Sequence, residues 1–174
     1  MTKYIKQVNA QKDILYNNIL LLCRNAIFYT KFDLIDTFQN RINLIFLHMS
    51  FLFIKLKHKN ENRFYKDFFQ KMFDLTFSKI ELNMREIGYG DVTVNKSMKL
   101  LVKLFYNILL NCENYKNKNL SNKKLFLIKY LSFKNNKKNV DNIDLVQYFD
   151  KYEAFCLDLT LDSVLKGDLN FNYN

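Results

Sequence analysis

Apolar side chains recur along this chain at the spacing of α-helices rather than that of β-strands. In residues 6–24, for example, Ile14, Leu15, Ile19 and Leu22 fall on one helical face. A second helix is predicted from an Asp36-Thr37 cap to about His58, because short side-chain oxygens accept the free N–H groups of a first turn. Further stripes predict helices over about 64–87, 95–115, 123–133, 143–157 and 161–165.

The most apolar stretch is Ile42 to Leu56, in the second of these helices. His48, Ser50 and Lys55 interrupt it, and it is shorter than the roughly 20 residues that a membrane span needs. We therefore interpret it as a central helix that is buried by its neighbours rather than by lipid.

Residues that break helices are rare, since the chain has no proline and three glycines in 174 residues. A sheet protein of this size needs many tight turns, which use both residue types heavily. The sequence therefore predicts an all-α, single-domain bundle of about six to seven helices over residues 1–174. Residues 1–12 are expected to fray, and residues 168–174 are expected to trail off after Gly167 closes the last helix.

Two of the glycines lie together in the turn Gly88-Tyr89-Gly90-Asp91. Glycine adopts positive φ at little steric cost, so Gly88 is predicted to end the preceding helix. Asp91 is expected to cap the next helix or to pair with Arg85, and the cap is the favoured interpretation.

The formal net charge is +10, which favours nucleic acid, an anionic membrane or an acidic protein as partner. Lys96, Lys99 and Lys103 follow one helical stripe, and Arg85 lies across the turn from them. These four cations are a candidate docking patch, although an ordinary solvated helix face would have the same pattern. The aromatic side chains of the third helix are a candidate groove, although core packing accounts for most of them: Phe64, Tyr65, Phe68, Phe69 and Phe73.

Catalytic and metal-binding motifs are missing from the sequence. The three cysteines are far apart and the only histidines are His48 and His58, so neither a disulfide framework nor a metal site is predicted. His48 lies in an apolar run and is interpreted as a hydrogen-bonded structural residue. The sequence has no nucleophile elbow, phosphate-binding loop or dinucleotide fingerprint. We therefore expect a binding protein with no cofactor, and not an enzyme.

Several blocks of the sequence occur in the order found in one known family. The first runs from Cys23 to Tyr29 and is followed by Asp36-Thr37 and Arg41, and the second is Leu47-His48-Met49. The third and most specific runs from Met84 to Lys96, continues through Lys99 and Phe105-Tyr106, and precedes a closing block at residues 165–169. These blocks resemble the ubiquinol–cytochrome c chaperone family, the assembly factors of the cytochrome bc1 complex. Ile35 stands where that family usually has proline, so the turn before Asp36 is expected to be looser.

The resemblance implies a chaperone that binds newly made cytochrome b, with a small co-chaperone and the ribosome or an anionic membrane surface as further partners. It implies a cytoplasmic protein peripheral to the inner membrane of a bacterium, or one on the matrix side in a mitochondrion; DNA is not an expected partner. The hypothetical partner-binding residues are Arg85, Tyr89, Asp91, Lys96, Lys99 and Lys103. The structural motif residues are Asp36, Thr37, Arg41, His48, Gly88, Gly90 and Tyr106. A general RNA- or ribosome-binding protein and an enzyme with a helical quinone or lipid pocket stay open as alternatives.

Overall fold

The computed structural model describes the backbone of residues 2–57, 63–134 and 142–173. Within these residues it contains eight helices, of which α2 and α8 are short. They are α1 (Thr2–Cys23), α2 (Ile27–Thr30), α3 (Phe38–Lys57), α4 (Arg63–Glu86), α5 (Asp91–Glu113), α6 (Leu120–Tyr130), α7 (Ile143–Asp158) and α8 (Leu161–Lys166). The predicted all-α bundle is confirmed. Helix α1 includes the segment that was expected to fray, and α5 begins four residues earlier than predicted.

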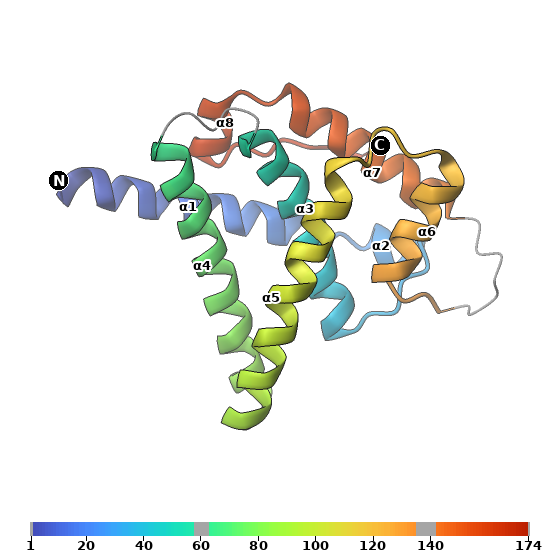
Figure 1. The fold of residues 1–174 in the computed structure, drawn as a ribbon, viewed down its shortest axis with the longest axis horizontal. Helices are drawn as coiled ribbons and strands as arrows, with labels where there is room; N and C mark the ends of the chain where they lie inside the picture. Colours follow the sequence, from blue (N-terminus) through green and yellow to red (C-terminus); the bar gives the residue numbers. More distant parts are fainter. Residues whose placement is uncertain (1, 58–62, 135–141, 174) are drawn as a thin grey trace.

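Helix α3 forms the centre of the bundle (Figure 1). Its residues 42–54 are all buried, because α1, α4, α5 and α7 pack around it. The prediction of a central buried helix is thus confirmed. Of the helices within the described residues, none combines the length and the apolar character that crossing a membrane requires.

Helices α4 and α5 form a hairpin whose turn lies at the lower tip of the molecule in Figure 1. Gly88 has a φ of +101°, in the left-handed region, and ends α4 as predicted. The buried side of α5 consists of Val94, Leu101, Phe105, Ile108 and Cys112, and it packs mainly on α3. Helix α4 packs on α1 and α3, so both arms of the hairpin are attached to the core, and α5 leaves its opposite side exposed.

The C-terminal segment packs onto the bundle instead of trailing off. Gly167 has a φ of +80° and follows α8, and its carbonyl accepts a hydrogen bond of 2.6 Å from the Asn18 side chain in α1. Leu169 is buried, and the ring of Phe171 lies 5.4 Å from that of Tyr148 in α7. The expectation of a loose tail was wrong because aromatic residues at its end fill a gap beside α7.

Candidate functional site

The turn between α4 and α5 is held by an ion-pair network. The guanidinium of Arg85 contacts the carboxylate of Glu81, at 2.9 Å, and that of Asp91. Helix α5 is capped by the backbone of Gly90 without a side-chain bond, so the favoured interpretation of Asp91 as a cap was wrong. Its alternative, a partner for Arg85, is what the structure contains. Because two carboxylates surround one guanidinium, this corner adds no net positive charge.

The outward side of α5 combines lysines with apolar side chains. Lys96, Lys99 and Lys103 are all exposed there, opposite the buried side of the helix. The same side exposes Val92 (69%), Leu100 (65%), Tyr106 (46%) and Leu110 (60%). We call this set of seven residues the α5 face. Among the described carboxylates, none pairs with its three lysines.

Arg85 does not belong to the α5 face. Arg85 lies in the last turn of α4. With about 100° of rotation per residue, its partner Asp91 lies about 80° around α5 from Lys99 and about 120° from Lys103. Tyr89 is exposed in the turn that leads into the face. The structure therefore brings the three lysines together, whereas Arg85 pairs with Glu81 and Asp91 at the turn. Sequence reasoning found the lysines but missed Val92, Leu100 and Leu110, although helical phase alone puts them on the same side.

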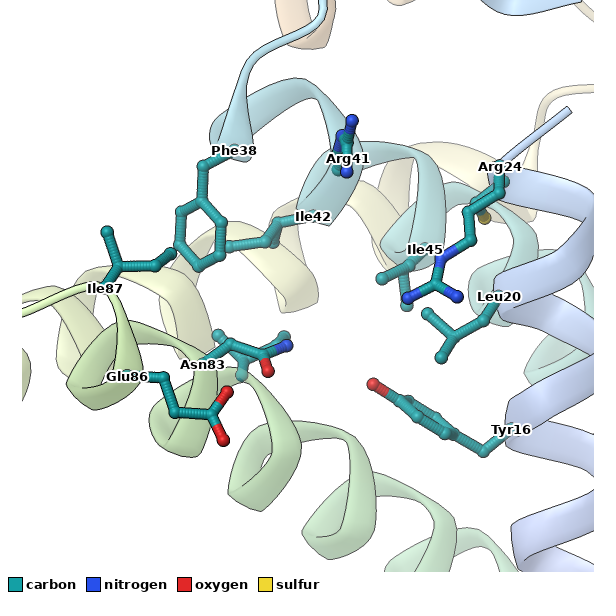
Figure 2. Close-up of a pocket in the computed structure, with 12 residues that line it drawn as sticks. Tyr16, Leu20, Arg24, Phe38, Arg41, Ile42, Ile45, Asn83, Glu86 and Ile87 are labelled. Atoms are coloured by element: carbon teal, nitrogen blue, oxygen red, sulfur yellow. The ribbon is translucent and has the colours of Figure 1, made fainter. Parts of the chain in front are cut away.

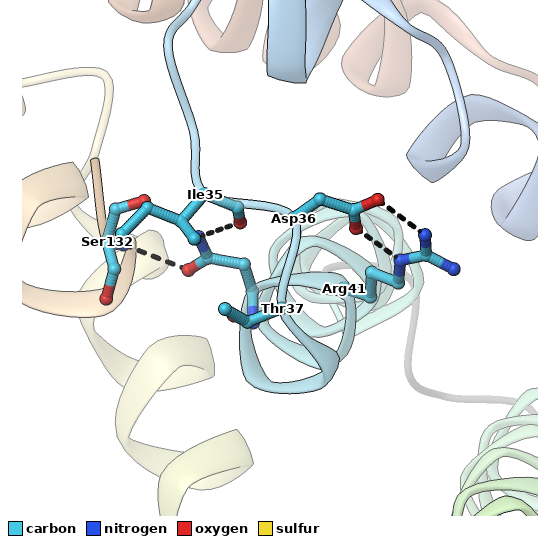
Figure 3. A network of polar contacts seen from close by, with 6 residues as sticks. Ile35, Asp36, Thr37, Arg41 and Ser132 are labelled. Carbon is cyan, nitrogen blue, oxygen red and sulfur yellow. Dashed lines mark hydrogen bonds and ion pairs between the residues drawn. The ribbon is translucent and has the colours of Figure 1, made fainter. Parts of the chain in front are cut away.

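The first motif block forms a capped and braced helix start, shown in Figure 3. The Thr37 hydroxyl accepts a hydrogen bond of 3.2 Å from the backbone N–H of Asn40, so Thr37 caps α3. Arg41 donates two hydrogen bonds to the Asp36 carboxylate, at 2.6 and 2.7 Å. These bonds hold the pKa of Asp36 below its usual value. Asp36 and Arg41 are thus positioned by each other.

Asn40 joins this turn to a segment far away in the sequence. Its amide nitrogen donates to the carbonyls of Ile35 and Ser132, both at 2.7 Å, and its oxygen accepts from the N–H of Ser132 at 2.9 Å (Figure 3). The N–H of Ile35 also donates to Ser132, at 3.0 Å. Isoleucine keeps an N–H that proline lacks, so this bond is one that a proline at position 35 could not donate. Sequence reasoning missed Asn40, which is buried.

His48 has the geometry of a structural histidine. It is fully buried; Nδ1 lies 2.7 Å from the Leu44 carbonyl and Nε2 lies 2.8 Å from the Tyr148 hydroxyl. A neutral ring that donates to Leu44 and accepts from Tyr148 satisfies both contacts. Burial lowers the pKa of His48 to about 4. His58, the other histidine, lies outside the described residues.

The aromatic stripe of α4 contributes chiefly to the core, as the sequence predicted for most of it. Phe68 is buried, and Phe69 and Phe73 are half-buried and pack against the core. The side chains of Phe64 and Tyr65 lie outside the described part of the chain. The three cysteines are free and buried, as expected of small core residues.

A pocket of about 250 Å³ opens between α1, α3 and α4 (Figure 2). Leu20, Ile42, Ile45 and Ile80 make its apolar floor. Its polar residues are Tyr16, Arg24, Arg41, Asn83 and Glu86. Arg24 and Arg41 come from the first motif block and Glu86 from the third, so the pocket joins blocks that are far apart in the sequence. Tyr16 and Asn83 lie outside the blocks and were missed.

Comparisons with known proteins agree with this assignment of blocks. Residues 30–166 match the model of the ubiquinol-cytochrome C chaperone family. The chain belongs to this family. The fold of this family member is shared by a protein described as the Cbp3 homolog from Brucella abortus, whose crystal structure is 21% identical in sequence. The TM-score is 0.83, over 99% of this chain and 94% of that chain. A search of curated proteins gives no significant match.

Proposed function

We propose that this protein is an assembly chaperone that binds newly made cytochrome b and promotes its entry into the bc1 complex. The observation that carries the proposal is the family match over residues 30–166, which includes the second and third motif blocks and the α5 face. The family's description is ubiquinol-cytochrome C chaperone. Such a role needs a binding surface rather than catalytic groups.

The α5 face is the proposed client-binding surface. Newly made cytochrome b has apolar helices that stay unprotected until assembly, and Val92, Leu100 and Leu110 offer apolar area to cover them. Burial of apolar surface contributes roughly 25 cal/mol per Å², so a few exposed side chains of this size supply useful affinity. Lys96, Lys99 and Lys103 would meet acidic side chains or lipid phosphates at the edge of the same client.

The turn between α4 and α5 supports the proposed binding surface. The ion pair of Arg85 and Asp91 links the end of α4 to the start of α5, and Tyr89 extends the surface beyond the start of α5. The protein would act at the inner membrane surface, on its cytoplasmic side in a bacterium, with a small co-chaperone and the ribosome as further candidate partners. No reaction is assigned to it.

A complementation experiment tests the proposed function. A strain without this protein should assemble less bc1 complex and accumulate less cytochrome b, and the wild-type chain should restore both. Charge reversal at two lysines of the α5 face, Lys96→Glu with Lys99→Glu, should restore them poorly while leaving helical content unchanged.

The matched control reverses Lys66 and Lys79, two exposed lysines of α4 that lie outside the face. It makes the same change in net charge, so it should complement as well as wild type. Normal bc1 levels in the deletion strain would refute the chaperone role. Equal complementation by both double variants would refute the α5 face as its binding surface.

A further inference from the structure

The pocket between α1, α3 and α4 contains polar groups that the protein itself leaves without partners. In Figure 2 the Tyr16 hydroxyl, the Arg24 guanidinium and the Asn83 amide point into the same space above the apolar floor. Among the described residues, none of the three forms a side-chain hydrogen bond or ion pair. Tyr16 is only 4% exposed, and burial raises the pKa of its hydroxyl, so it stays a neutral hydrogen-bond donor.

The charges around the pocket are uneven. Arg41 is already neutralised by its two bonds to Asp36, so Arg24 is the cation that has no carboxylate partner among the described residues. Glu86 lies on the opposite side of the pocket, near Ile87 (Figure 2). An anionic group is therefore attracted to the Arg24 end and repelled from the Glu86 end. This asymmetry gives the occupant a fixed orientation.

The size of the pocket limits what it can hold. Pockets for drug-sized ligands measure roughly 300–1,000 Å³, and this one, at about 250 Å³, is smaller. It has room for one large apolar side chain together with a carboxylate on the same α-carbon. In a polypeptide, only the C-terminal residue joins these two groups so compactly, because Asp or Glu would need a second residue for the apolar part.

We infer that this pocket binds the C-terminal residue of a partner polypeptide that ends in a large apolar amino acid. Its side chain lies on the floor made by Ile42 and Ile45, and its carboxylate accepts hydrogen bonds from Arg24 and Tyr16. The Asn83 amide is placed to bond the last peptide group. The inference goes beyond the proposed function and does not depend on cytochrome b as client.

Nuclear magnetic resonance titration of the full-length, ¹⁵N-labelled protein tests this inference with three probes. The first is N-acetyl-Leu-Phe with a free carboxylate, the second is the same dipeptide as its C-terminal amide, and the third is octanoate. The free acid should shift the side-chain signals of Arg24 and Asn83 saturably, and should bind at least tenfold more tightly than the amide.

Two variants complete the test. Arg24→Gln should reduce binding of the free acid to the level of the amide, with an unchanged melting temperature, because Arg24 is exposed. Lys99→Gln, on the α5 face, should bind the free acid as wild type does. Equal binding of acid and amide, or no saturable shift in the pocket, would overturn the inference. Tighter binding of octanoate than of the peptide acid would assign the pocket to a free amphiphilic acid instead.

Probe binding and complementation are separate readouts. Loss of probe binding in Arg24→Gln, together with failure of the α5-face variants to affect bc1 assembly, would keep this inference and refute the proposed binding surface. If no probe binds in the pocket but the α5-face variants impair bc1 assembly, the inference about the pocket is refuted and the proposed binding surface is kept.

Discussion

The three glycines of this chain occupy three different environments, which makes an alanine series a sharp test of the structure. Gly167 has a φ of +80°, and a Cβ there would lie 2.8 Å from Ile14 Cγ2 and 2.9 Å from the Leu15 nitrogen. Gly88 has a φ of +101°, but a Cβ there meets no atom within 4 Å. Gly90 has a φ of −70° and equally open surroundings.

The expected changes in the free energy of unfolding follow from these environments. Positive φ costs an alanine roughly 1–2 kcal/mol, which is the whole penalty at Gly88. At Gly167 the same strain combines with a clash against the α1 backbone, which adds about 1–3 kcal/mol. At Gly90, loss of a favourable N-cap residue and restriction of the unfolded chain act in opposite directions, so the net change is within about 0.5 kcal/mol.

Urea unfolding followed by circular dichroism measures this series. The stability order should be wild type and Gly90→Ala, then Gly88→Ala, then Gly167→Ala, with similar m-values. A Gly167→Ala variant as stable as Gly88→Ala would contradict the close approach of α8 to α1. A Gly90→Ala variant that loses as much as Gly88→Ala would contradict the backbone of the turn.

Three further predictions concern the core. Burial lowers the pKa of His48 from 6.5 to about 4. Between these pH values the unfolded chain binds more protons than the folded one. The free energy of unfolding, measured in urea, should therefore fall as the pH drops from 6.5 to 4, by about 3 kcal/mol in total. His48→Gln should lose this pH dependence; an unchanged slope would contradict the assignment. Asn40→Ala should lower the free energy of unfolding by about 2–4 kcal/mol, because it leaves backbone groups at Ile35 and Ser132 unpaired. An unchanged urea midpoint would refute the role of Asn40 in joining these two segments. The three buried cysteines should resist a thiol reagent such as Ellman's reagent in the native protein and react fully in urea; fast native labelling would argue against their burial.

Features set by neighbouring residues could be predicted from the sequence. The helical phase of apolar residues predicted the buried α3, and Gly88 predicted the end of α4. Lys96, Lys99 and Lys103 were correctly placed on one side of α5, because the spacing of residues within two helical turns fixes their relative direction.

Features set by tertiary contact could not be predicted in this way. Asn40 and Ser132 are 92 positions apart. They become partners only through the way α6 packs, which the local sequence does not reveal. The choice between cap and ion pair for Asp91 depended on where α4 ends and where Arg85 points. The pocket forms because Tyr16, Arg24 and Asn83 lie close together in space, although Asn83 is far from the other two in the sequence. No local sequence pattern predicts this proximity.

The central claim is that this protein binds cytochrome b soon after its synthesis. Immunoprecipitation from pulse-labelled cells tests it most directly. We predict that the wild-type chain and the Lys66→Glu, Lys79→Glu control capture labelled cytochrome b, which declines during a chase as the bc1 complex forms. The Lys96→Glu, Lys99→Glu variant should capture several-fold less. If the wild-type chain captures no labelled cytochrome b at any time of the chase, the claim is contradicted.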